Sequence, residues 1–579
     1  MENILRKTGK TILLGNEAIV RGALESGVQF VSTYPGTPAS EIGDSFSNIL
    51  KSKKGDFYFE YSVNEKVALE AGIGASFSNL KTLVAMKNFG LNVASDSLLP
   101  FCYTGTQGPT VIVVADDPSC YSSAQSEENS RAFAQLAHMP ILEPADPQEC
   151  KDFVGVAFQV SQKYKIPVMV RLTTRVAHQR AVVQLKKISA IKKEGIFIEN
   201  KNQFVTMPPR VLEMKKELLA KIDKIKNEVS EKSFLNKIQN QRSKLNSKTE
   251  FSQGENEGED ETKSHRFQNS KVGIITSGIS YLYTIESLKE LSLDIPVLKL
   301  GFFHPLPEEK IKKFIGSPVT GLKKVLVIEE LEPYLEREVE RLAKNTNPKI
   351  QIFGKNYLSE IGELKTENII PLLAKITGKK IKKNKNIEID PIKHLPRFCS
   401  GCPYWNVFNG IKKATTKYKN IIFGGDIGCY MMAATCFDSF YDYLSCMGSS
   451  IGIGHGIAKA TNGKKQKIIS FIGDSTFFHS GIPALINCVH NESDILLIIL
   501  DNQITAMTGH QPHPGIKNGK PRIKIENIIK ALEIKNWKKI DPLKNYNDFI
   551  KTAEKFLDQK GVSVIIASHP CWLYYGKKK

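Results

Sequence analysis

The sequence has no hydrophobic run long enough to cross a membrane, although 41% of its 579 residues are hydrophobic. A membrane helix needs about 18 or more apolar residues in a row, and the apolar stretch at 494–501 is far shorter. Residues 1–10 carry mixed charge and lack the apolar core of a secretory signal. These absences predict a cytoplasmic protein, and its length predicts several domains, each with a buried core.

Acidic residues are fewer than basic ones: 60 Asp and Glu stand against 80 Lys and Arg, for a net charge of +20. The excess is mostly lysine in runs such as 379–386. These runs contain no interleaved aromatic residues and match no known nucleic-acid-binding motif. We therefore expect neither nucleic acid nor a membrane as a partner.

Cysteine is sparse, with ten residues, and a cytoplasmic chain does not use cysteine for a disulfide framework because cellular reductants keep thiols reduced. Six are isolated and are expected to pack as small apolar side chains: Cys102, Cys120, Cys150, Cys436, Cys446 and Cys488. The other four lie near predicted strands: Cys399, Cys402, Cys429 and Cys571. Four thiolates can hold either Zn²⁺ or a 4Fe–4S cluster, and their spacing leaves both open.

Short apolar strands alternate with amphipathic stretches along most of the chain. This pattern predicts an α/β fold with three parallel-sheet domains covered by helices, over residues 1–190, 271–390 and 391–579. The segment 191–270 differs, because 211–229 has helical periodicity and 246–270 has almost no apolar residues. We expect a charged helical insertion followed by a flexible linker there.

The strongest local signal lies in residues 471–503, where two predicted strands end in polar residues. One strand leads into Asp474, and the next ends at Asp501-Asn502. Neighbouring parallel strands bring their carboxyl ends to one edge of a sheet. Carboxylate and amide oxygens suit Mg²⁺, which completes its shell with water and phosphate oxygens. The alternative is an ordinary strand-helix-strand unit with a polar turn.

This segment resembles the diphosphate-binding motif of thiamine diphosphate enzymes, in which GDG is followed, after a helix, by NN. Here Ser475 and Asp501 replace the third glycine and the first asparagine. The resemblance implies that Mg²⁺ is held by Asp474, Asn502 and the carbonyl of Ile504. The glycines of 447–460 do not fit the dinucleotide pattern GxGxxG, so we expect this helix start to line the same site. The implied cofactor-binding residues are Gly448, Ser449, Gly473, Asp474, Ser475 and Asn502.

A second part of the implied site lies in the N-terminal domain. Glu65 opens a predicted helix in "EYSVNEKVALEAGIGAS" (60–76), and taken alone it would be a solvated acid favoured by the helix dipole. The segment resembles the pyrimidine-domain glutamate segment of 2-oxoacid:ferredoxin oxidoreductases, and "TYPGTPASEI" (33–42) resembles their YPITPS motif. The resemblance implies that Glu65 is the catalytic glutamate facing the cofactor's pyrimidine and that Thr37 lies near the substrate carboxylate.

The same family favours the cluster over zinc. Its thiamine-binding subunits carry a CPGC-type pair, a GIGC cysteine and a late PC cysteine, which together ligate one 4Fe–4S cluster. The matching positions are Cys399, Cys402, Cys429 and Cys571. Residues 499–515, "ILDNQITAMTGHQPHPG", resemble the alpha subunits of indolepyruvate ferredoxin oxidoreductases, and the likeness covers 9–190 and 270–579. The three domains are then the pyrimidine, transketolase C-terminal-like and diphosphate domains.

The resemblance implies a complete reaction and its partners. We expect oxidative decarboxylation of an aryl 2-oxoacid, indolepyruvate, with CoA to an aryl-acetyl-CoA, CO₂ and reduced ferredoxin. A smaller beta subunit and a dimer of this chain within a heterotetramer are implied. The family's usual ferredoxin-like module is not found in the sequence, so electrons are expected to leave through a separate subunit or ferredoxin. The alternatives are another 2-oxoacid, a non-redox thiamine decarboxylase and a non-catalytic binding subunit.

Overall fold

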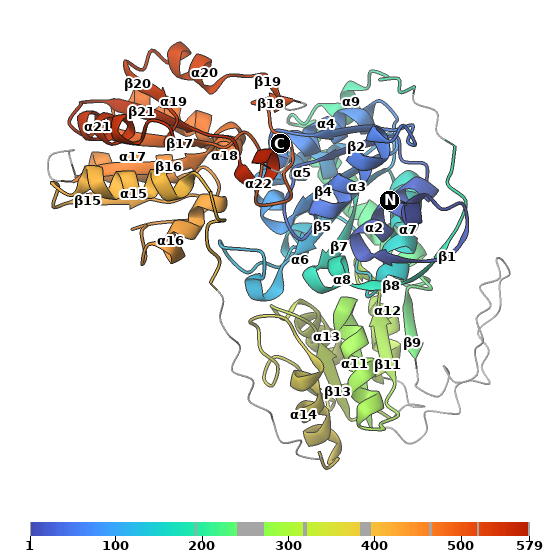
Figure 1. The fold of residues 1–579 in the computed structure, drawn as a ribbon. Helices are drawn as coiled ribbons and strands as arrows, with labels where there is room; N and C mark the ends of the chain where they lie inside the picture. Colours follow the sequence, from blue (N-terminus) through green and yellow to red (C-terminus); the bar gives the residue numbers. More distant parts are fainter. Residues whose placement is uncertain are drawn as a thin grey trace. The chain divides into compact units, whose positions relative to one another are not determined.

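The computed structural model describes residues 2–190, 194–239, 271–316, 321–381, 395–461, 466–517 and 520–576. The chain divides into two compact units (Figure 1). The first comprises Met1–Glu60 and Glu65–Asn386, and the second comprises Tyr61–Asn64 and Ile387–Lys579. Within the described ranges, no helix has both the length and the apolar character needed to cross a bilayer.

The first unit contains a seven-stranded sheet with the order β12-β6-β7-β5-β4-β2-β3. Its central strands run parallel, as predicted for residues 1–190: β2 (Phe30–Thr33), β4 (Thr82–Lys87), β5 (Thr110–Asp116) and β7 (Val168–Thr173). Every residue of β4, β5 and β7 is buried, as expected for apolar strands covered on both faces. The remaining strands are β3 (Tyr58–Tyr61), β6 (Ile141–Leu142) and β12 (Phe302–His304).

Five helices carry much of the connecting chain around this sheet: α2 (Gly15–Glu25), α3 (Ser40–Lys51), α4 (Glu65–Phe77), α5 (Asn88–Thr104) and α7 (Pro147–Tyr164). Helix α4 follows β3, and α5 begins directly after β4. The sequence elements that resemble the pyrimidine domain therefore lie on α4 and on the loop after β2.

The first unit also contains a five-stranded sheet with the order β14-β13-β10-β11-β9. Four of its strands run parallel: β10 (Val272–Ser277), β11 (Val297–Leu300), β13 (Lys324–Ile328) and β14 (Gln351–Phe353). The fifth, β9 (Asn236–Gln239), pairs antiparallel with β11 and comes from the predicted insertion. The helical periodicity at 211–229 is confirmed by α10 (Arg210–Ile225), whereas the linker predicted at 246–270 lies outside the described residues.

A buried ion-pair cluster joins the two sheets of the first unit. Arg131 donates two hydrogen bonds of 2.6 Å to Glu143 and one of 2.7 Å to Glu329, at the end of β13. Arg171, on β7, donates to Asp116 at 2.7 Å. Strand β12 also leaves the middle segment to pair with β6. Polar and backbone bonds therefore hold the first and middle predicted segments in one compact unit.

The second unit is built on a five-stranded parallel sheet with the order β15-β16-β17-β21-β20. Its strands are β15 (Ile421–Gly424), β16 (Lys467–Gly473), β17 (Ile495–Asp501), β21 (Val562–Ser568) and β20 (Asn536–Ile540). Covering helices include α15 (Tyr404–Thr415), α17 (Ser449–Ala460), α19 (Ile482–His490) and α21 (Tyr546–Leu557). All seven residues of β17 are buried in the middle of the sheet, which fits the prediction of a parallel α/β fold.

Candidate functional site

Asp474 and the turn after β17 meet at the carboxyl edge of the second sheet. Strands β16 and β17 pair in parallel, with Gly473 opposite Leu500. The backbone N–H of Gln503 donates to Asp474 Oδ2 at 2.7 Å, and the Thr505 hydroxyl donates to Ser475 Oγ at 2.9 Å. The structure therefore brings together two segments that the sequence separates by a helix.

The Asn502 turn completes this arrangement. Asn502 Oδ1 accepts a hydrogen bond of 3.1 Å from the backbone N–H of Ile504. Asn502 is 7% exposed and Asp474 is 2% exposed, so both oxygen donors lie in a partly desolvated edge. A carboxylate, an amide oxygen and a backbone carbonyl are a donor set that fits Mg²⁺.

The charge balance at this edge also fits a cation. Burial, together with the negative charge of Asp474, raises the pKa of Asp501 to about 6. His513 Nε2 lies 3.1 Å from Asp474 Oδ2; burial opposes its protonation, but the two aspartates raise the pKa of His513 overall. Lys539 Nζ also lies 3.7 Å from Asp501 Oδ2, and its charge opposes the rise in the pKa of Asp501. The two buried carboxylates therefore have His513 and the exposed Lys539 as partners, and a divalent cation would stabilise their charged forms further.

Asp426 fixes the helix start predicted to line the diphosphate. Its carboxylate accepts hydrogen bonds from the backbone N–H of Gly448 at 2.9 Å and of Ser450 at 3.0 Å. Burial raises its pKa to about 6, against the effect of these hydrogen bonds. Gly448 has φ +83°, the left-handed conformation that glycine adopts without strain. Asp426 was not among the residues predicted from the sequence, although an acid just after a predicted strand is the same signal that identified Asp474.

The four predicted cluster cysteines lie near enough to influence one another. Burial raises the pKa of Cys402 to about 12, and the charges of Cys399 and Cys571 add to this effect. Burial, followed by the charges of Cys402 and Cys571, raises the pKa of Cys429 to about 12. In the part of the chain that the structure describes, no three Cys, His, Asp or Glu side chains form a metal-holding group. The cluster therefore stays a prediction.

Cys571 is tied to the Asn502 turn. Its backbone N–H donates to the carbonyl of Asn502 at 2.9 Å, and its Sγ lies 4.0 Å from His510 Nε2. A backbone hydrogen bond therefore joins the predicted cluster ligand Cys571 to the turn that carries Asn502, a predicted Mg²⁺ ligand.

Among the six cysteines predicted to pack, Cys102, Cys150 and Cys488 are buried, which confirms the prediction for them. Cys446 is exposed, so the prediction is wrong there.

Glu65 is the first residue of α4 and is only 6% exposed. This burial excludes a solvated first-turn acid. Gly90, in the first turn of α5, packs directly against its side chain: a Cβ on Gly90 would lie 2.9 Å from both Cδ and Oε1 of Glu65. The absence of a side chain at Gly90 is what lets the carboxyl group occupy this position.

Thr37 lies in the loop between β2 and α3. Its hydroxyl is 3.4 Å from Ser40 Oγ. The buried side chain of Asn16, on α2, donates to the carbonyl of Pro38 at 2.7 Å and to Glu41 at 2.8 Å. Helix α2 therefore holds this loop in place at the carboxyl end of β2.

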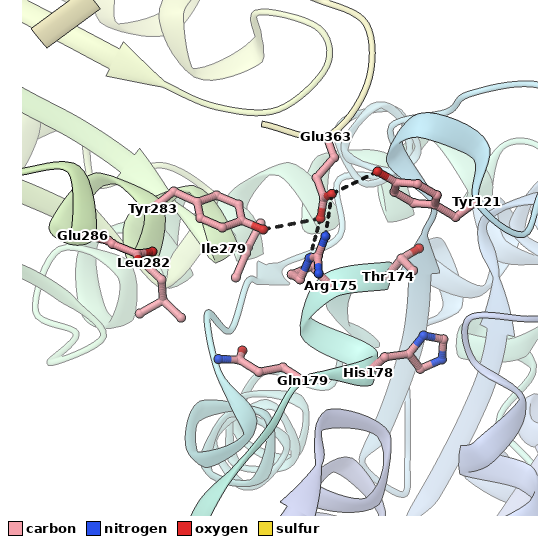
Figure 2. Close-up of a pocket in the computed structure, with 10 residues that line it drawn as sticks. All are labelled: Tyr121, Thr174, Arg175, His178, Gln179, Ile279, Leu282, Tyr283, Glu286 and Glu363. Atoms are coloured by element: carbon pink, nitrogen blue, oxygen red, sulfur yellow. Dashed lines mark hydrogen bonds and ion pairs between the residues drawn. The ribbon is translucent and has the colours of Figure 1, made fainter. Parts of the chain in front are cut away.

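A cavity of about 580 Å³ opens elsewhere in the first unit, beside α8 (Thr174–His178) and α11 (Gly278–Glu290). Figure 2 shows Arg175 facing Glu363, to which it donates two hydrogen bonds of 2.7 and 2.9 Å. Neither Thr37 nor Glu65 lines this cavity. Its arginine is already neutralised by Glu363, so Arg175 is a poor binding group for an anionic substrate.

Two family models match the chain. Residues 21–248 match "Pyruvate flavodoxin/ferredoxin oxidoreductase, thiamine diP-bdg", and residues 426–567 match "Thiamine pyrophosphate enzyme, C-terminal TPP binding domain". The "Indolepyruvate oxidoreductase subunit IorA" of Methanothermobacter thermautotrophicus is 40% identical over 589 aligned positions, covering 100% of this chain and 89% of the relative. The chain belongs to the IorA family of thiamine diphosphate-dependent oxidoreductases.

A second IorA subunit agrees with this assignment. The IorA subunit of Pyrococcus horikoshii is 38% identical over 98% of this chain and 86% of its own length. A solved 2-oxoglutarate:ferredoxin oxidoreductase from Magnetococcus marinus covers 64% of this chain and 65% of its own chain, at 18% identity and a TM-score of 0.46. The family assignment rests on the IorA relatives alone, and it confirms the resemblance that the motifs indicated.

Proposed function

We propose that this chain is the thiamine-binding alpha subunit of an indolepyruvate:ferredoxin oxidoreductase. The supporting observation is its similarity to IorA subunits over essentially its whole length. In the proposed reaction an aryl 2-oxoacid anion and the thiol of CoA yield an aryl-acetyl-CoA, CO₂, one proton and two electrons, which ferredoxin accepts. The proposed assembly is a dimer of this chain with a smaller beta subunit, in a heterotetramer located in the cytoplasm.

The residues of the second unit suit the cofactor's charged end. Asp474, Asn502 and the carbonyl of Ile504 would hold Mg²⁺, and the diphosphate would lie against the segments of Gly473-Ser475 and Gly448-Ser449. When bound, thiamine diphosphate supplies a nucleophilic carbon and an electron sink for decarboxylation. Asp426 positions the backbone of the α17 start for this task.

Glu65 and Thr37 are the proposed catalytic residues of the first unit. Glu65 presents a carboxyl group in a buried position, where water is largely excluded and where a proton can be held or transferred. Thr37 offers a hydroxyl from a loop that α2 fixes. We propose that Glu65 transfers a proton and that Thr37 orients the substrate.

The test is anaerobic reduction of methyl viologen by the complex co-purified with its beta subunit. CoA is supplied with indolepyruvate, phenylpyruvate or pyruvate, one at a time. We expect the highest kcat/KM for indolepyruvate and a loss of at least about 100-fold in Glu65→Gln, because the proton-transferring group is removed. Decarboxylation without dye reduction would support a non-redox decarboxylase instead, and full activity of Glu65→Gln would contradict its role.

The cluster is tested separately through its last predicted ligand. Cys571→Ser should lower the iron content and the visible absorption of the reconstituted complex, while thiamine diphosphate still binds, because a serine hydroxyl is a poor iron ligand in place of a thiolate. Cys488→Ser is the matched control, since Cys488 is buried in the same unit and is not a predicted ligand. Unchanged iron in Cys571→Ser would contradict the predicted ligand set, and zinc in place of iron would favour the zinc alternative.

A further inference from the structure

Lys87 is a buried lysine at the carboxyl edge of the seven-stranded sheet. It is the last residue of β4 and is only 8% exposed. Strand β4 lies between β2, which leads into the Thr37 loop, and β5. Ligands of parallel α/β sheets bind at this edge, so the ammonium group lies in the region where a substrate would be held.

The side chain of Lys87 runs along the loop that carries Thr37. A Cβ on Gly36 would lie 3.0 Å from Cβ and 3.6 Å from Cδ of Lys87. Glu65 is also near, because its charge contributes to the pKa of Lys87. Gly90, three residues after Lys87, is the glycine against which Glu65 packs. Lys87 thus lies beside both proposed catalytic residues.

Other buried cations of this region already have carboxylate partners. Arg171 pairs with Asp116, and Arg131 pairs with Glu143 and Glu329. Arg175, on α8, is exposed rather than buried, and it too pairs with a carboxylate, that of Glu363, as Figure 2 shows. Because carboxylates already neutralise these arginines, they are poor candidates for binding an anionic substrate.

Lys87 differs from them. Its Nζ donates to the carbonyl of Ser122 at 2.7 Å and lies 4.8 Å from the centroid of the Phe89 ring. No ion pair joins it to a carboxylate within the described ranges. Burial lowers its pKa to about 8, against the nearby charges of Asp117, Cys120, Glu128 and Glu65, so the group is mostly protonated at neutral pH. An ammonium has three N–H donors, and an anionic ligand would offset the cost of burying this charge.

The side chain of the next residue, Asn88, has unsatisfied polar atoms. Asn88 is 1% exposed, and neither its amide nitrogen nor its amide oxygen has a hydrogen-bond partner in the described part of the chain. Leaving buried polar atoms without hydrogen bonds is energetically costly. Lys87 and Asn88, where β4 passes into α5, can therefore both make further hydrogen bonds.

We propose that the Lys87 ammonium binds the carboxylate of the 2-oxoacid and so sets the specificity of this site for anionic substrates. The inference rests on the proposed function. In this arrangement the carboxylate lies against Lys87 and Thr37, and the keto group is directed towards the region of Glu65.

The experiment compares charged and neutral ligands in the complex with its beta subunit. Lys87→Met keeps the length and apolar stem of the side chain but removes the charge, and Lys87→Arg restores the charge. The probes are indole-3-propionate, a carboxylate without a keto group, and its neutral amide, both as competitive inhibitors. Lys81→Met is the matched control: Lys81 directly precedes β4, at its other end, and donates its ammonium to a backbone carbonyl in a similar way.

We expect Lys87→Met to raise the inhibition constant of the propionate and the KM for indolepyruvate by roughly 10- to 100-fold, the usual effect of losing a hydrogen bond to a charged group. The inhibition constant of the amide, the KM for CoA and thiamine diphosphate binding should stay within about twofold. The wild-type kcat/KM should fall above about pH 8, where Lys87 loses its proton. Lys87→Arg should recover part of the affinity and move this fall to higher pH.

The outcomes separate this role from the proposed function. If the wild-type complex oxidises no 2-oxoacid, the proposed function fails. Suppose that the wild type is active and that Lys87→Met changes the inhibition constants of the propionate and the amide equally, or changes neither. Lys87 is then only a structural residue that holds the Ser122 loop. An effect of Lys81→Met equal to that of Lys87→Met would overturn the proposal in the same way.

Discussion

At the scale of single residues, Gly90 shows how little space surrounds the predicted catalytic carboxyl group. Gly90→Ala should leave the helix intact, because alanine favours helices more than glycine. The added methyl group would displace Glu65, and a shift of about 1 Å in a catalytic group can lower the rate by about 100-fold. We expect at least a tenfold loss of kcat, roughly, with an unchanged melting temperature.

Gly74→Ala is the control for this substitution. Gly74 lies on α4, the helix that Glu65 begins, and a Cβ there meets nothing within 4 Å. The activity of Gly74→Ala should equal that of the wild type. If both variants lose activity alike, the effect comes from the helices and not from the position of the Glu65 carboxyl group.

At the scale of elements, Asn236 holds β9 at the point where β11 passes into β12. Its Oδ1 accepts hydrogen bonds of 2.9 and 2.8 Å from the backbone N–H groups of Gly301 and Phe302. The side chain is 2% exposed, so Asn236→Ala would remove two buried hydrogen bonds, and the Gly301 N–H would keep only its bond of 3.1 Å to the carbonyl of Leu235. We expect a loss of stability of about 2–4 kcal/mol, measured as a shift of the first unfolding transition in urea.

Lys237→Ala provides the comparison on the same strand. Lys237 is exposed, and substitutions of exposed residues usually change stability by less than about 0.5 kcal/mol. Equal shifts for the two variants would show that β9 as a strand, and not the Asn236 side chain, determines the stability of this junction.

At the scale of the whole molecule, the first unit depends on a buried charge cluster that responds to pH. Burial raises the pKa of Glu330 to about 7, with Glu363 adding to the shift and Arg171 and Arg131 opposing it. A carboxyl group whose pKa is higher in the folded than in the unfolded chain stabilises the fold at low pH, and this contribution is lost as the pH rises through about 7.

Glu330→Gln should therefore flatten the pH dependence of thermal stability. Between pH 5 and pH 8 the free energy of unfolding of the wild type should decrease by on the order of 1–3 kcal/mol more than that of the variant. Calorimetry would show this as a larger decrease in the temperature of the first melting transition. Glu290→Gln, an exposed change at the end of α11, should behave like the wild type. A variant with the same pH dependence as the wild type would contradict the raised pKa of Glu330.

Much of the fold could be predicted because each buried strand is a short apolar run that ends in polar residues. The same pattern placed Asp474 and Asn502 at one sheet edge, since neighbouring parallel strands must align their carboxyl ends. Asp426 and Lys87 were missed because a single polar residue after a strand looks the same whether it is solvated or buried. Burial depends on residues distant in the sequence, such as Gly448 and Ser450 around Asp426.

By itself, the sequence determined the parallel α/β architecture, the family and the candidate residues at strand ends and helix starts, because these follow from local hydrophobic periodicity and from motif spacing. Only the tertiary structure decided that Glu65 is buried against Gly90, that β9 and β12 join sheets outside their own segments, and that Lys87 is a buried cation without a carboxylate partner in the described ranges. The physical reason is that desolvation and charge pairing depend on neighbours that the fold brings together, and local sequence does not specify them.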